Sequence, residues 1–113
     1  MKVDRVKGHL DLLLLGILSA EPGHGYAVIT TLRDRTDGLI DLTEGAVYPA
    51  LHRLEDLGLL ASDWHSVAGR RRRLYRITQS GHAALSREKA EWETLSAAMT
   101  IVLRTASMRG VPA

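Results

Sequence analysis

Two groups of side chains in this sequence could donate hydrogen bonds to phosphates or other anions. The first group is Tyr48 and His52, which share one side of a predicted helix, with Arg53 at its edge. Phenol, imidazole and guanidinium groups contact the phosphates and base edges of nucleic acids. The second group is residues 70–76, Arg-Arg-Arg-Arg-Leu-Tyr-Arg, which hold five of the fifteen basic residues and no acidic residue.

The net charge of +2 hides this uneven distribution. Outside residues 70–76 the chain has ten basic against thirteen acidic residues, which is a net charge of −3. A positive patch this local on a slightly acidic chain indicates a polyanion partner. A solvated charged loop would have the same composition, and the arginine run alone does not separate the two interpretations.

Residues 43–57 must form a helix if the first group is to share a face. The apolar residues recur at steps of three and four, as in a helix packed on a core: Val47, Ala50, Leu51, Leu54 and Leu57. The opposite face holds Gly45, Tyr48, Pro49, His52 and Asp56. Thr43 is the expected N-cap, with Glu44 favourably placed in the first turn, and Gly58 ends the helix.

Two shorter helices are expected before this one. Residues 8–20 are apolar on nearly every side, and Glu21-Pro22-Gly23 stops that helix. Residues 24–35 form the second helix, with Tyr26 expected to pack between helices. Residues 39–42 are an apolar connector that is long enough for a minimal strand.

A hairpin and a long helix complete the chain. Residues 59–65 and 71–77 have the composition of two strands around a turn at residues 66–69, with Tyr75 anchoring the hairpin to the helices. Thr78 is a candidate N-cap for a final helix of about 30 residues. Its apolar positions follow a 3-4-3-4 spacing from Trp92 onward, which is typical of a two-helix contact: Leu85, Trp92, Leu95, Met99, Val102 and Ala106.

The predicted fold is mainly α with a small β-hairpin wing: a winged helix-turn-helix domain at residues 1–78 and a C-terminal dimerisation helix at 79–113. The chain has no cysteine, and its five histidines lack metal-ligand spacing, so we expect no disulfide, metal or cofactor. No nucleophile elbow or convergent acid pair indicates an enzyme. The apolar run at Leu12–Leu15 is too short to span a membrane, and we expect a cytoplasmic protein.

Residues 44–55, Glu-Gly-Ala-Val-Tyr-Pro-Ala-Leu-His-Arg-Leu-Glu, resemble the signature of PadR-type transcriptional regulators. The resemblance continues in His24-Gly25-Tyr26, in residues 69–78 and in Gly81. It implies a dimeric bacterial or archaeal winged-helix repressor of the short type, with one C-terminal helix. The DNA-binding residues would be Thr43, Gly45, Tyr48, His52, Arg53, Arg70, Arg71, Arg72 and Arg73. Family members often have proline where Arg71 stands and an aromatic residue where Leu74 stands.

The expected function is that of a regulator which binds a pseudo-palindromic double-stranded DNA operator as a homodimer. Trp92 could simply fill the dimer interface, or it could stack a planar aromatic effector as in some short PadR-like proteins. Such an effector site would use Trp92, Leu95, Ala98 and Met99. The rival interpretation is a winged-helix adaptor that binds proteins without sequence-specific DNA binding, because the third helix carries more acidic than basic residues.

Overall fold

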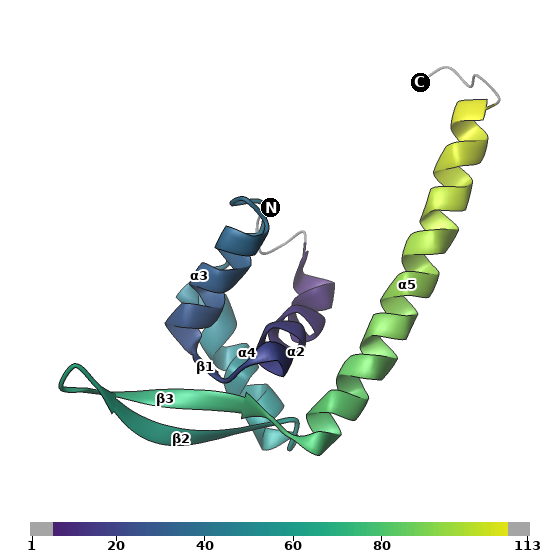
Figure 1. Cartoon of the computed structure of the whole chain (residues 1–113). Coiled ribbons are helices and arrows are strands. Elements are labelled where there is room, and N and C mark those ends of the chain that lie inside the picture. The colour runs from purple at the N-terminus through teal and green to yellow at the C-terminus, as the bar shows by residue number, and fades with distance from the viewer. Residues whose placement is uncertain (1–5, 109–113) are drawn as a thin grey trace.

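The computed structural model describes residues 6–108, without the side chains of Lys7 and of residues 105–108 (Figure 1). The elements, in chain order, are η1 (Lys7–His9), α2 (Leu10–Ala20), β1 (Gly23–His24), α3 (Gly25–Arg35), α4 (Glu44–Asp56), β2 (Leu60–Val67), β3 (Arg70–Ile77) and α5 (Gln79–Met108). Helices α2, α3 and α4 form the body, the β2–β3 hairpin projects from it, and α5 extends away. The radius of gyration is 16.9 Å, against about 13 Å for a compact domain of this length, so the protomer is elongated.

Helix α4 packs through its apolar face, as the sequence predicted. The side chains of Val47, Leu51 and Leu54 are completely buried, and Thr43 Oγ1 accepts a hydrogen bond from the Ala46 N–H at 3.2 Å, which confirms the N-cap. The prediction that Leu57 continues the buried face is wrong, because its side chain is 62% exposed. The helix ends one residue earlier, at Asp56, and the chain then turns away through Gly58 with φ +77°.

The hairpin has a tighter turn than predicted. Its two central residues, Ala68 and Gly69, both have positive φ, 51° and 79°, and Val67 is paired with Arg70. This is the geometry of a two-residue primed turn, whose twist matches that of the flanking strands. The predicted four-residue turn at 66–69 is therefore wrong, and the paired strands run on to the tip.

The sheet also has a third strand, in an unpredicted place. Strand β1 pairs antiparallel with β3 through Gly23↔Tyr75 and His24↔Leu74, which gives the order β1-β3-β2. The connector at residues 39–42, which was expected to supply a minimal strand, consists of bends and unstructured chain. The pair of residues just before α3 lies beside β3, and it therefore ties the wing to the helical body.

Hydrogen bonds around the first turn of α5 join this helix to the body. Thr78 Oγ1 accepts a hydrogen bond from the Gly81 N–H at 3.0 Å and donates one to the Gly58 carbonyl oxygen at 2.7 Å. The Thr78 N–H donates to the Leu59 carbonyl oxygen at 3.1 Å. A Cβ at Gly81 would overlap that carbonyl oxygen and lie 2.6 Å from an Ile77 side-chain carbon. Residue 81 must therefore be glycine for α5 to leave the body at this angle.

We expect Gly81→Ala to lower the free energy of unfolding by about 1–3 kcal/mol, since the new methyl group collides with backbone that cannot move aside. Gly16→Ala in α2 is the matched control, because nothing lies within 4 Å of a Cβ there. That substitution should raise the free energy of unfolding by about 0.5–1 kcal/mol, as for other helix-interior glycines. Urea denaturation followed by circular dichroism measures both, and equal effects at the two positions would contradict the close contact.

Candidate nucleic-acid interface

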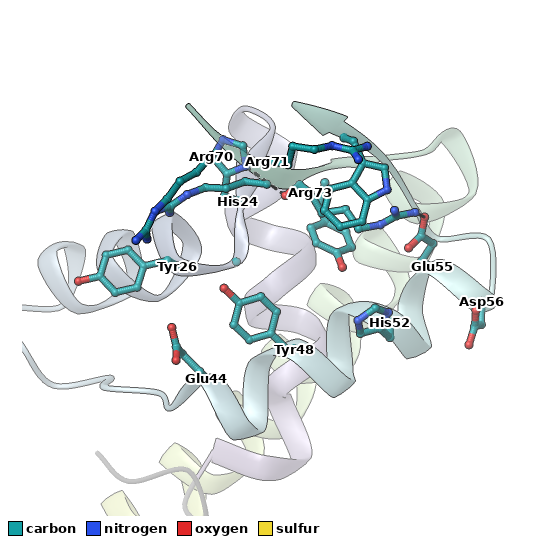
Figure 2. A pocket seen from close by; sticks show the side chains of 14 residues that line it. His24, Tyr26, Glu44, Tyr48, His52, Glu55, Asp56, Arg70, Arg71 and Arg73 are labelled. Carbon is teal, nitrogen blue, oxygen red and sulfur yellow. Dashed lines mark hydrogen bonds and ion pairs between the residues drawn. The ribbon is translucent and has the colours of Figure 1, made fainter. Parts of the chain in front are cut away.

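The outward face of α4 and the β2–β3 hairpin enclose an open hollow of about 990 Å³ (Figure 2). Tyr48 and His52 project into it from α4, and the arginine run of β3 forms the facing wall. The residues lining it are His24, Gly25, Tyr26, Glu44, Tyr48, His52, Glu55, Asp56, Trp64, Arg70, Arg71, Arg72, Arg73 and Tyr75. Both groups of anion-binding side chains identified in the sequence therefore meet at one surface.

Tyr48 is held in position by a glycine of the neighbouring helix. A Cβ at Gly25 would lie 2.6 Å from Tyr48 Cε1 and 2.8 Å from its Cζ, so the phenol ring occupies the space that a side chain at residue 25 would fill. The residue is 36% exposed, and its hydroxyl makes no hydrogen bond to another described residue. The first turn of α3 thus fixes the ring while leaving its hydroxyl available to a ligand.

The hairpin divides its arginines between two faces. Cross-strand pairing places Trp64 opposite Arg73 and Ser66 opposite Arg71, on the same side as Tyr75. Arg70 and Arg72 alternate onto the other side. Each face of β3 therefore carries two of the four consecutive arginines.

The root of the hairpin contains a small polar network. Glu55 Oε2 accepts a hydrogen bond from Ser62 Oγ at 2.6 Å and lies 3.7 Å from Arg73 Nη2. Burial of Tyr75, which is 1% exposed, raises the pKa of its phenol, and the Glu55 carboxylate raises it further. His24 Nδ1 lies within hydrogen-bonding distance of the Arg73 carbonyl oxygen, at 3.1 Å. These contacts fix the angle between the wing and α4.

Arg53 is turned away from the hollow. Its guanidinium donates two hydrogen bonds to the Asp11 carboxylate of α2, from Nη2 at 2.6 Å and from Nη1 at 2.9 Å. The hydrogen bond to Asp11 raises the pKa of Arg53, with a further contribution from the negative charge of Asp11. A bidentate pair uses the donors that a phosphate would need. The geometry gives Arg53 a role in joining α2 to α4.

The nine predicted DNA-binding residues therefore do not all lie at this surface. It brings six of them into the hollow: Tyr48, His52, Arg70, Arg71, Arg72 and Arg73. Thr43 caps α4, Gly45 lies exposed in its first turn, and Arg53 pairs with Asp11. Sequence reasoning did not select Trp64 or Glu55, and its placement of Tyr26 between helices is wrong, because that side chain is 53% exposed at the rim of the hollow.

Helix α5 carries the predicted interface residues on a side that the body does not cover. The side chains of Trp92, Leu95, Met99 and Val102 are all exposed. Leu85 lies nearer the root, where it packs against the core of its own protomer, and the Ala106 side chain lies outside the described part of the chain. Ala98 is exposed beside this stripe.

A helix with a buried apolar face, packed against a second helix and flanked by a basic hairpin, is the arrangement of the winged helix-turn-helix class. The chain matches the Transcriptional regulator PadR-like family over residues 14–87, and it belongs to that family. The protein is therefore a PadR-like transcriptional regulator.

Solved structures of similar chains have the same fold. A PadR family transcriptional regulator from Eggerthella lenta superposes with a TM-score of 0.80 at 34% identity, covering 91% of this chain and 88% of that one. A transcriptional regulator from Clostridium thermocellum also has a TM-score of 0.80, at 30% identity over 86% of this chain and 95% of its own.

A relative was also found by sequence. The transcriptional regulator Rv3488 of Mycobacterium tuberculosis is 47% identical over 55 residues, which are 49% of this chain and 51% of that protein.

Two other kinds of site are absent from the described part of the chain. Among residues 6–108 no helix has the length and apolar character needed to cross a membrane. No group of three or more histidine, cysteine, aspartate or glutamate side chains in the same range could hold a metal ion.

We expect Arg53→Ala to lower the free energy of unfolding by about 0.5–1 kcal/mol, the range for a partly exposed bidentate pair. Asp11→Ala should have a similar effect, and the double variant should be no less stable than the worse single variant, since both remove the same contact. Denaturant titration of the four proteins measures this cycle. Fully additive losses would show that Arg53 and Asp11 stabilise the fold independently.

Proposed function

We propose that this protein is a sequence-specific, double-stranded DNA-binding regulator, with α4 in the major groove and the β2–β3 wing on the adjoining backbone. The observation that carries the proposal is the convergence of Tyr48, His52 and the β3 arginines on one hollow, opposite the completely buried face of α4. Base edges would be contacted from α4, and phosphates by the wing and by the Tyr48 hydroxyl.

The distribution of charge supports different roles for the two elements, with base contacts from α4 and phosphate contacts from the wing. The hollow also contains Glu44, Glu55 and Asp56, so α4 itself attracts the phosphate backbone only weakly. Arg70 and Arg72 form no ion pair with another described residue, and their full charge is available for phosphates. The wing would therefore supply most of the affinity, while α4 supplies the discrimination between sequences.

We further propose that the protein represses transcription as a homodimer in the cytoplasm, where its DNA target lies. The exposed apolar side of α5 supports pairing with the same side of a second copy, which would bury Trp92, Leu95 and Met99. Two α4 helices related by a two-fold axis would contact a pseudo-palindromic operator. A planar aromatic effector stacked near Trp92 would then change DNA affinity by favouring one dimer geometry.

For DNA binding, Arg70→Ala with Arg72→Ala should flatten the dependence of log K on log salt concentration by about 0.9 for every phosphate that the variant no longer neutralises. The control is Arg87→Ala with Arg104→Ala, which removes the same charge from exposed positions on α5. Fluorescence anisotropy with a duplex selected from a random pool measures the slope. A wild-type protein without a steep negative slope would instead favour the adaptor interpretation.

For assembly, the wild-type protein should sediment as a dimer, and Leu95→Glu with Met99→Glu should give a folded monomer, since two unpaired charges would be buried in each half of the interface. Ala90→Glu with Ala97→Glu, on the other side of α5, should remain dimeric. A planar aromatic dye should quench Trp92 emission in the dimer and leave the monomer unchanged. A monomeric wild-type protein would refute the assembly, and an unresponsive dimer would refute the effector site.

A further inference from the structure

Trp64 is a large aromatic residue in the middle of β2, on the wing. It is 55% exposed, so it contributes little to the core. Its ring instead contacts two arginines of the neighbouring strand: the guanidinium carbons of Arg71 and Arg73 each lie 5.0 Å from a ring centroid. Both distances are within the range of a cation–π interaction. The ring thus contacts two of the four consecutive arginines.

The hairpin register explains why the ring contacts these two arginines and not their neighbours. Trp64 lies directly opposite Arg73 and diagonally opposite Arg71, on the side of the hairpin that faces α4. Arg70 and Arg72 alternate onto the opposite face of β3, although they also line the hollow, and neither makes a cation–π contact with an aromatic ring among the described residues. The two pairs of arginines therefore differ in how much their side chains are restrained.

The two arginines on the ring also differ from each other. Arg73 lies 3.7 Å from Glu55 at the root of the hairpin, and its side chain is only one-third exposed. Arg71 is exposed and has no ion pair with another described residue, so the Trp64 ring is what restrains its guanidinium. Arg73 is therefore partly neutralised by the body, whereas Arg71 keeps its full charge nearer the tip.

A ring and a carboxylate restrain an arginine in different ways. A carboxylate occupies N–H donors and cancels the charge, as Asp11 does for Arg53. An aromatic ring attracts the cation through its π face, so the in-plane N–H groups stay free and the charge is not cancelled. A phosphate approaching Arg71 would thus meet a guanidinium that is already ordered, and less side-chain entropy would be given up on binding.

We propose that Trp64 is a positioning residue for DNA binding: it holds the Arg71 guanidinium at the mouth of the hollow for a backbone phosphate, while Arg73 and Glu55 fix the root of the wing. This inference rests on the proposed DNA-binding function. It assigns unequal roles to four arginines that look equivalent in the sequence.

The test is a double-mutant cycle between Trp64 and Arg71, measured by anisotropy on a duplex selected from a random pool. Trp64→Leu should weaken binding about five- to thirty-fold for a dimer with two wings, with an unchanged salt slope, because every arginine is still present. Trp64→Phe, which keeps an aromatic face, should weaken binding less. Arg71→Ala should flatten the slope by about 0.9 per wing.

The decisive comparison is the effect of Trp64→Leu on DNA binding in two different variant proteins. In an Arg71→Ala protein it should have little further effect, because Glu55 still holds Arg73, whereas in the matched Arg72→Ala protein its full effect should remain. Equal effects in both backgrounds, equal effects for Phe and Leu, or wild-type affinity for Trp64→Leu would each overturn the proposal. None of these results would remove the steep salt slope of the wild-type protein, so they leave the DNA-binding function itself standing. Circular dichroism melting checks that each variant is folded.

Discussion

The burial of one face of α4 is the constraint on which the rest of the structure depends. Val47, Leu51 and Leu54 are each completely inside the core, and burying a side chain of this size contributes about 1.5–3 kcal/mol. Rotating the helix by even a quarter turn would expose these residues to water. The direction of Tyr48 and His52 is therefore set by apolar residues on the opposite side of the same helix.

The wing is aimed by a second set of contacts. Tyr75 is buried between the hairpin and the helices, β1 pairs with β3 beside it, and Glu55 joins the end of α4 to Ser62 and Arg73. An isolated hairpin is only marginally stable in water, so these contacts at its root are what give the arginines a defined position. The tip beyond them relies on its own turn and on the Trp64 ring.

Much of this organisation was predictable from the sequence, because it depends on local periodicity. The spacing of the leucines placed α4 and its outward face, and Thr43 marked its start. Other features of the structure have a different origin. The place of β1, the exposure of Tyr26 and the pairing of Arg53 with Asp11 all depend on which segments meet in space, and no local pattern encodes that.

The hairpin register is a clear example of a feature that the sequence did not predict. Ala68-Gly69 carries a weaker turn signal than Asn-Gly, because alanine seldom adopts positive φ, and the turn was therefore expected to be two residues longer. With a turn of the wrong length, the strands are aligned in another register, and the pairing of Trp64 with Arg73 is not predicted. A register error of this kind changes the neighbours of every side chain along the strands.

The glycine at the root of α5 has a mechanical consequence. Because Gly81 lies directly against the Leu59 backbone, α5 starts from a rigid joint shared with the end of α4 and the base of the wing. A helix of 30 residues is about 45 Å long, so a tilt of about 5° at that joint moves its far end by about 4 Å. A small change of angle at the root of α5 would therefore displace its far end by about the width of one side chain.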